Sequence, residues 1–291
     1  MPELPEVEVT RRKIAPSLVG RRLASLATTR PSYFFLTPPG RLRRLLPGRT
    51  VTALDRHGKY LVAALDDGSR LLLHLGMTGQ LFAAGAHSVR LLSATARASL
   101  PPESQPGFRP DAHTHLVLRF EDDGPEVYFR DVRKFGKVQL SAPGEALERL
   151  ARLGRDALDV SGDYLFEATR GRTVVIKNLL LAQDVLAGVG NIYADEALFL
   201  AGVRPTRRAR RVTRAEARAI AAALRRVMAR SIETGGSSIS DYVAPDGRDG
   251  AYQDERRVYA RRGEPCAACA TPIRKIVVGA RGTHYCPRCQ R

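Results

Sequence analysis

The four cysteines of this chain constrain its fold more than any other feature, because all of them lie between positions 266 and 289. Four cysteines so close together cannot form a disulfide framework distributed through 291 residues. They form two C-x2-C pairs, Cys266 with Cys269 and Cys286 with Cys289, in the pattern C-x2-C-x16-C-x2-C. This spacing is typical of a tetrahedral four-thiolate zinc site built from two turns on a hairpin. Because four protein ligands leave no coordination position for water, we expect one structural Zn2+.

The net charge indicates a polyanionic partner. The chain has 47 Lys and Arg against 30 Asp and Glu, a net charge of +17, which is more positive charge than solubility needs. No run approaches the roughly 18 consecutive apolar residues of a membrane-spanning helix, and no apolar signal-peptide core follows the start. We therefore expect a cytoplasmic protein that binds nucleic acid and no membrane. A merely basic enzyme would carry a similar charge, so charge alone does not name the function.

Length and an apolar share of 44% predict one large or two moderate domains, of which two is the preferred reading. Strand-like runs in the first half and helical patterns in the second favour the α+β class. Residues 5–15 are expected to form a helix, with Pro5 in its first turn and Arg11, Arg12 and Lys13 in its last. Residues 83–112, rich in Ala, Ser and Pro, predict a long loop. The strand-like runs that predict an N-terminal β-sandwich are Thr50–Leu54, Tyr60–Leu65, Arg70–Leu75, His115–Phe120, Glu126–Phe129 and Lys137–Leu140.

Helical periodicity dominates from about residue 145. The expected helical segments are 145–154, 172–182, 190–202 and Thr213–Glu233. The many arginines between Arg207 and Arg230 favour an ordinary solvated helix face over direct contact of most of them with DNA. We assign residues 1–142 to the β-sandwich domain, 143–254 to a helical domain and 255–291 to the zinc-binding segment.

The first residues suggest amine chemistry. Removal of Met1 would leave Pro2 with a free secondary amine, and an α-amino group titrates at roughly 7.7 to 8, well below a lysine. The adjacent helix N-terminus should lower that pKa further by disfavouring positive charge. Attack on a sugar C1′ would give an iminium that promotes strand elimination, with Glu3 as a proton donor and acceptor. Since Met-Pro starts are common, these two residues alone favour a merely structural role.

Five motifs in order make the chain resemble the formamidopyrimidine-DNA glycosylase family. They are MPELPEVE at 1–8, HLGMTG at 74–79, RDVRKFGK at 130–137, GVGNIYADEALF at 188–199 and the terminal cysteine pattern. The resemblance spans nearly the whole chain. The PELPE opening is closer to the purine-repair branch than to the endonuclease VIII branch, which typically begins PEGPE.

The resemblance implies an N-terminal β-sandwich with a helix at its start, and a helical C-terminal domain with a helix-two-turn-helix motif and a zinc-finger hairpin. It implies Pro2 as the Schiff-base nucleophile and Glu3 as the acid and base. Lys59, in RHGKYL, would contact the phosphate beside the lesion and transfer a proton in β-elimination. Asn191 would clamp a phosphate, and Arg281, in ARGTHYC, would grip the backbone and serve δ-elimination.

An enzyme that works on a base must take it out of the duplex, so residues that fill the void are expected. The resemblance assigns intercalation to Met77, Arg133 and Phe135, although Met77 and Phe135 would otherwise be read as core residues. It assigns DNA contacts to His113, Arg133 and Arg172. His113 and His115 flank one threonine and could equally be an ordinary surface pair.

Two departures from the family pattern are visible. Residues 77–113 are longer than expected, so the register at His113 is less secure, and Val132 stands where a proline is often found.

The function implied is a bacterial, nucleoid-associated, monomeric base-excision repair enzyme that binds damaged double-stranded DNA. It would excise oxidised purines, 8-oxoguanine and formamidopyrimidines, and then nick the abasic strand by β,δ-elimination. Two alternatives remain open at this point. One is an endonuclease VIII-like glycosylase for oxidised pyrimidines, and the other is a non-catalytic zinc-ribbon DNA-binding protein.

Overall fold

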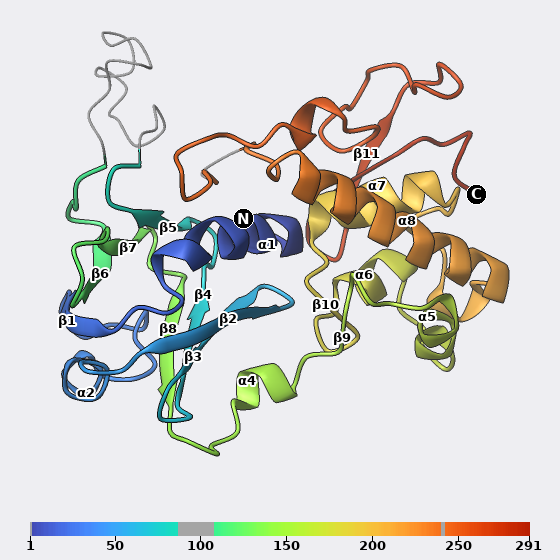
Figure 1. Cartoon of the computed structure of the whole chain (residues 1–291). Helices are drawn as coiled ribbons and strands as arrows, with labels where there is room; N and C mark the ends of the chain where they lie inside the picture. Colours follow the sequence, from blue (N-terminus) through green and yellow to red (C-terminus); the bar gives the residue numbers. More distant parts are fainter. Residues whose placement is uncertain (1, 87–107, 240–241) are drawn as a thin grey trace, which may run out of the picture. The chain divides into compact units, whose positions relative to one another are not determined.

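Two four-stranded antiparallel sheets form the N-terminal half in the computed structural model, which describes residues 2–86, 108–239 and 242–291 (Figure 1). One sheet has the order β1-β6-β7-β5, made of Leu23–Thr28, Thr114–Phe120, Val127–Asp131 and Gly79–Ala83. The other has the order β2-β3-β4-β8, made of Val51–His57, Tyr60–Leu65, Arg70–His74 and Lys137–Ser141. The predicted α+β class and β-sandwich are confirmed.

The core lies between these sheets because alternate side chains along each strand point inward. In β3 the burial alternates strictly, with Leu61, Ala63 and Leu65 inside. One continuous apolar cluster joins residues of both sheets, including Leu73 of β4 and Phe129 of β7. The burial of β3 therefore has the period of two that a strand with one face in the core shows.

Helix α1 (Leu4–Ile14) packs on the sandwich through Val7 and Ile14, which belong to the same cluster. On its other side, the carboxylate of Glu8 accepts hydrogen bonds from Arg11 and Arg12 within the helix and from Arg56 of β2. Although burial raises the pKa of Glu8, these guanidinium groups lower it to about 2. This ion cluster fixes α1 to the edge of the second sheet.

The described chain divides into two compact units. The first contains residues 1–151 and also Thr234–Ala251, and the second contains Arg152–Glu233 and Tyr252–Arg291. The sequence-based boundaries placed 234–251 in the helical domain, but this segment packs on α1. Ser237 N donates to Glu6 Oε1 at 2.9 Å and Lys13 pairs with Asp246 at 2.8 Å.

The second unit is helical, as expected, with the zinc-binding hairpin at its end. Its longest helix is α8 (Arg214–Glu233), whose buried side includes Ile220, Leu224 and Met228. The hairpin is β11 (Arg274–Val278) with β12 (Arg281–Tyr285). The remaining α-helices and short strands among the described residues are α2 (Pro39–Leu45), α4 (Glu148–Ala151), β9 (Arg155–Asp156), α5 (Gly162–Thr169), α6 (Ile176–Leu181), β10 (Leu186–Ala187) and α7 (Asn191–Leu200).

The predicted long loop at 83–112 falls mostly on residues 87–107, which lie outside the described residues. At its end, Phe108 packs against Phe82 and Tyr128, with ring centroids 5.0 and 5.4 Å apart. Among the helices that the structure describes, none is both long and apolar enough to cross a bilayer.

Candidate active site

Pro2 and Glu3 are buried at the start of α1. Glu3 is the N-cap residue and forms a capping box with Glu6, in which Glu3 N donates to Glu6 Oε2 at 2.8 Å. A capping box satisfies backbone N–H groups that the helix itself leaves without partners. The nitrogen of Pro2 is thereby held close to the positive end of the helix dipole, where a neutral amine is favoured over a charged one.

A group of basic side chains lies at one end of the second sheet. Lys59 follows Gly58 in the two-residue turn between β2 and β3, and Gly58 has a φ of 55° that favours glycine. In the neighbouring strands, Tyr60 pairs with His74 and His74 pairs with Lys137. Burial and the charges of Lys59 and Lys137 lower the pKa of His74 to about 4, so its imidazole is neutral at pH 7. His74 was not predicted as a site residue, although it begins the HLGMTG motif.

Met77 and Phe135 are exposed at the tips of two neighbouring turns, with 37% and 41% of their surfaces accessible. Arg133 shares the second turn, and its guanidinium lies 4.7 Å from the Phe135 ring centroid. The alternative reading of Met77 and Phe135 as core residues is therefore wrong. Two apolar side chains and one guanidinium stand together at the surface of the sandwich.

His113 and His115 do not form a surface pair. His115 is 1% exposed and packs on Phe34, with ring centroids 5.2 Å apart. Its Nε2 donates to the Asp131 carbonyl at 2.9 Å, and its Nδ1 lies 3.2 Å from the Thr29 hydroxyl. His113 is half-buried at the start of β6, so of the two it is the one that a ligand could reach.

In the helical unit, Asn191 and Arg281 lie on neighbouring segments. Asn191 is the first residue of α7 and donates from Nδ2 to the Gly282 carbonyl at 2.9 Å. Arg281 is exposed and follows a two-residue turn in which Gly279 and Ala280 both have positive φ. This contact joins the predicted phosphate-binding asparagine to the hairpin that carries the predicted catalytic arginine.

Lys177 and Asp195 form a buried ion pair in the same unit that was not predicted from the sequence. The Lys177 ammonium is fully buried, pairs with Asp195 at 2.6 Å and donates to the Thr283 hydroxyl at 2.7 Å. The only signal in the sequence was a lysine inside an apolar helical run, since its partners are far away along the chain.

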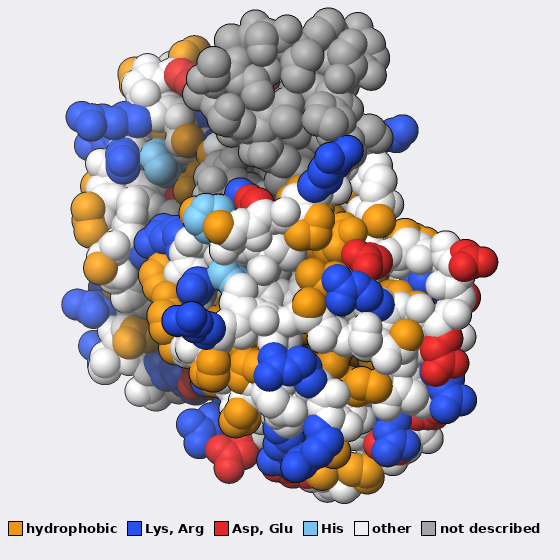
Figure 2. Space-filling model, turned by 90° about the vertical axis from the view of Figure 1, so that its left-hand side faces the viewer, with side chains coloured by type: hydrophobic (Ala, Val, Ile, Leu, Met, Phe, Trp, Pro, Cys, Tyr) orange, Lys and Arg blue, Asp and Glu red, His pale blue; other side chains and the backbone are white. Residues whose placement is uncertain are grey.

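Arg172 lies exposed between α5 and α6, on another segment of the same unit. Several arginines of the run at 207–230 have partners within the chain. Arg214 pairs with Asp163 and Glu167, and Arg230 pairs with Glu255. These contacts favour the solvated-face reading of the run. Lysine and arginine side chains are nevertheless spread over the face shown in Figure 2, in keeping with the net charge of +17.

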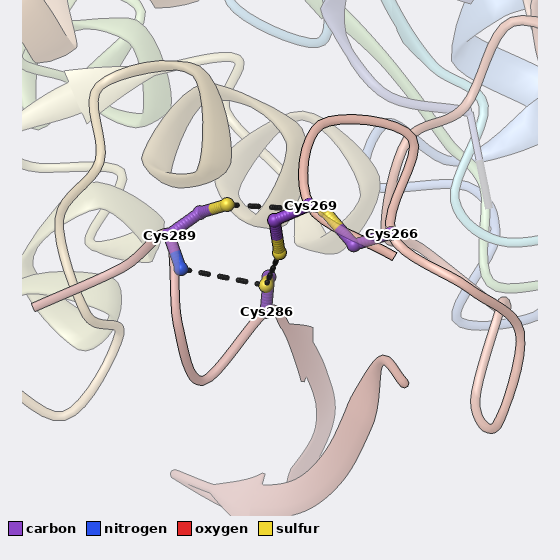
Figure 3. A group of neighbouring side chains, drawn as sticks. All are labelled: Cys266, Cys269, Cys286 and Cys289. Atoms are coloured by element: carbon purple, nitrogen blue, oxygen red, sulfur yellow. Dashed lines mark hydrogen bonds between the residues drawn. The ribbon is translucent and has the colours of Figure 1, made fainter. Parts of the chain in front are cut away.

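The four cysteine side chains converge on one point (Figure 3). Cys266 and Cys269 come from the loop before β11, and Cys286 and Cys289 follow β12. Their sulfur atoms all lie within 4.8 Å of one another. Since Zn–S bonds of about 2.3 Å in a tetrahedron separate the sulfurs by roughly 3.8 Å, the cluster fits one zinc ion.

Three known domain families match the chain in succession. The formamidopyrimidine-DNA glycosylase N-terminal domain matches residues 1–138, and the formamidopyrimidine-DNA glycosylase H2TH domain matches 153–243. The zinc finger found in FPG and IleRS matches residues 263–291. Together with the cysteine geometry, this match confirms the prediction of one structural zinc.

Full-length relatives agree with these domain matches. Formamidopyrimidine-DNA glycosylases from Solibacter usitatus and Cupriavidus pinatubonensis are 41% and 43% identical, over all of this chain and all of theirs. The crystal structure of MutM (Fpg) from Thermus thermophilus has a TM-score of 0.81 at 39% identity, covering 99% of this chain and 98% of that one. A point mutant of Lactococcus lactis Fpg, in complex with Fapy-dG containing DNA, has a TM-score of 0.85 at 33% identity and full coverage of both chains. This chain belongs to the formamidopyrimidine-DNA glycosylase family.

Proposed function

We propose that this protein excises oxidised purines, 8-oxoguanine and formamidopyrimidines, from damaged duplex DNA and then cleaves the abasic strand by β,δ-elimination. The observation that carries this proposal is the end-to-end similarity to Lactococcus lactis Fpg, which was solved with Fapy-dG containing DNA and with abasic-site DNA. The burial of Pro2 and Glu3 at the start of α1 supports it.

Pro2 is the nucleophile once Met1 has been removed. Its nitrogen attacks the sugar C1′, the bond from C1′ to the base breaks, and the departing base takes a proton from Glu3. The Glu3 carboxylate takes up the amine proton and passes it to O4′ as the C1′–O4′ bond breaks. This opens the sugar ring and leaves a cationic iminium between Pro2 and C1′. The iminium acidifies C2′, so that a proton leaves C2′ and the 3′ phosphate departs with its bonding electrons. Loss of the 5′ phosphate by δ-elimination follows.

The basic and polar residues bind the DNA backbone. Lys59 contacts the phosphate beside the lesion and transfers a proton in β-elimination, and Asn191 clamps a phosphate from the α7 N-terminus. Arg281 grips the backbone and serves δ-elimination, while His113 and Arg172 contact the DNA elsewhere. Affinity should therefore fall steeply between about 50 and about 200 mM salt.

Met77, Arg133 and Phe135 fill the space that the extruded nucleotide leaves. Unstacking a base costs a few kcal/mol, and apolar side chains inserted into the stack recover part of that cost. Their exposure on adjacent turns supports this role. We further propose that the protein acts as a monomer in the cytoplasm, at the nucleoid, since one lesion requires one binding site.

The proposal is tested by comparing base release from matched duplexes that contain 8-oxoguanine, a formamidopyrimidine or thymine glycol. Purine lesions should be released fastest, and a clear preference for thymine glycol would overturn the substrate assignment. Glu3→Gln should release no base yet bind abasic-analogue DNA as the wild type does. Unchanged base release by Glu3→Gln would remove this residue from the mechanism.

A further inference from the structure

Asp131 is buried directly beneath the two turns that carry Met77, Arg133 and Phe135. Its side chain has no solvent exposure, and it ends strand β7. Its carboxylate accepts three hydrogen bonds. Oδ1 accepts from the Thr78 hydroxyl at 2.5 Å and from Arg133 N at 3.2 Å, and Oδ2 accepts from Gly136 N at 2.7 Å.

These three donors come from both turns, so one carboxylate joins them. Thr78 belongs to the first turn and directly follows Met77. Arg133 and Gly136 belong to the second turn and stand on either side of Lys134 and Phe135. Thr78 Oγ1 also accepts from Arg133 N at 3.2 Å, which adds a direct bond between the turns.

The backbones of the two turns touch at glycines. A Cβ on Gly76, which has a φ of 64°, would lie 2.5 Å from both Gly136 N and the carbonyl carbon of Phe135. A Cβ on Gly136 would lie 2.9 Å from Asp131 Oδ2. Only glycine permits this approach at either position. The turns therefore form one packed unit, which we call the wedge platform (residues 76–78 and 131–136).

The platform is anchored to the core of the sandwich. The Asp131 carbonyl accepts from Nε2 of the buried His115 at 2.9 Å, and Asp131 N donates to the His113 carbonyl at 2.9 Å. The backbone of Asp131 is thus held by hydrogen bonds to His113 and His115. Its carboxylate binds both turns.

We propose that Asp131 is a positioning residue for base extrusion, which holds Met77, Arg133 and Phe135 as a single preformed wedge without touching DNA. The proposal rests on the intercalating role given to these three residues above. A preformed wedge inserts without first ordering its own loops, whereas separate loops would lose conformational freedom during insertion. Loss of the carboxylate should slow extrusion from a duplex and leave the covalent chemistry intact.

Only a carboxylate suits this position. It accepts on both oxygens, whereas an asparagine presents one oxygen and one NH2 group. In Asp131→Asn, either orientation of the amide turns its NH2 toward at least one of the donors from Thr78, Arg133 and Gly136. One buried N–H or O–H then loses its partner, which is costly in an interior.

The test compares Asp131→Asn with Asp67→Asn. Asp67 also accepts from a hydroxyl and a backbone N–H, both of Ser69, but it lies beyond the opposite end of β4. Each variant is assayed under single-turnover conditions on duplex DNA with one 8-oxoguanine and on a single strand with a preformed abasic site. Asp131→Asn should excise the base roughly 10- to 100-fold more slowly than Asp67→Asn. Both variants should cleave the single-stranded abasic site at nearly the wild-type rate.

A second pair of variants leaves the carboxylate in place. Thr78→Val removes one of its donors, and Thr78→Ser retains the hydroxyl. The valine variant should lose duplex excision selectively while the serine variant keeps it. If Asp131→Asn fails to fold, the two Thr78 variants still test whether the hydrogen bonds to Asp131 position the wedge.

Four outcomes separate this inference from the function on which it rests. Equal excision by Asp131→Asn and Asp67→Asn overturns the inference, as does equal behaviour of the two Thr78 variants. If Phe135→Ala and Met77→Ala also excise 8-oxoguanine normally, the wedge assignment itself is wrong. Slow duplex excision by both the wedge variants and Asp131→Asn, with normal abasic cleavage, supports both proposals.

Discussion

The ammonium of Lys177 lies 2.6 Å from a carboxylate oxygen of Asp195, and neither side chain is exposed to solvent. The other carboxylate oxygen accepts from His284 N at 2.8 Å, so the pair joins helices α6 and α7 to strand β12. That strand begins with Arg281. A buried pair of this kind fixes the hairpin only while both charges are present.

Lys177→Met should lower the free energy of unfolding by about 3 to 5 kcal/mol, because it leaves Asp195 buried without its counter-ion. Urea denaturation measures the change. The double variant Lys177→Met, Asp195→Leu should recover much of the loss, since no lone charge remains. The matched control is Glu126→Gln in the exposed Arg119 pair, with an expected change below about 1 kcal/mol. A loss in Lys177→Met no larger than in this control would show that the pair does not stabilise the unit.

The Glu8 cluster predicts a specific dependence of stability on pH. Its pKa in the folded protein is about 2 against an ordinary value of 4.5, so the unfolded chain binds more protons between these values. The stabilisation is fully present above about pH 4.5 and is lost as the pH falls toward 2. At pH 7, Glu8→Gln should be less stable than wild type by about 3 kcal/mol. The difference in the free energy of unfolding between wild type and Glu8→Gln should become smaller in denaturation curves measured at decreasing pH. Glu121→Gln, in the exposed Arg22 pair, serves as control, and a gap independent of pH would contradict the assignment.

Zinc removal should release the hairpin before it affects the sandwich. The apolar cluster at the cysteines is small, consisting mainly of Phe199, Val258 and Ile273 with the cysteines themselves. Metal binding therefore supplies much of the folding free energy of this segment. Cys269→Ser should bind less than one zinc per chain by metal analysis, lose DNA affinity and melt at a lower temperature. Ala268→Ser adds a hydroxyl between the ligands without removing a thiolate and should behave as wild type. Full zinc content in Cys269→Ser would argue against the four-thiolate site.

The features that the sequence predicted correctly are local. Strand β3 was predicted because turn residues bound its apolar run on both sides. The zinc site was predicted because its ligands stand in two close pairs. Strand β1 was missed because a register shift between Leu23 and Ser25 interrupts its alternation. Helix α5 was missed because it is short, although Ser161 accepts a capping bond from Tyr164 N.

The features that escaped prediction depend on distant partners. Lys177 can be buried because Asp195 and Thr283 bind its ammonium group. These partners are distant along the chain, so no local sequence pattern predicts the contacts. The contacts of Thr234–Ala251 with α1 could not be predicted because the two segments lie more than two hundred residues apart along the chain. Asp131 is one residue of a recognised motif, but its link to Thr78 is visible only in the fold.

In the proposed mechanism, Pro2 becomes covalently joined to the sugar of the damaged nucleotide. It is tested most directly by incubating the protein with duplex DNA that carries one 8-oxoguanine, adding borohydride, and locating any crosslink by peptide mass. The expected result is a reduced adduct at Pro2, with Met1 absent from the crosslinked peptide. Absence of an adduct on both 8-oxoguanine and abasic DNA, in protein shown to lack Met1, would contradict it.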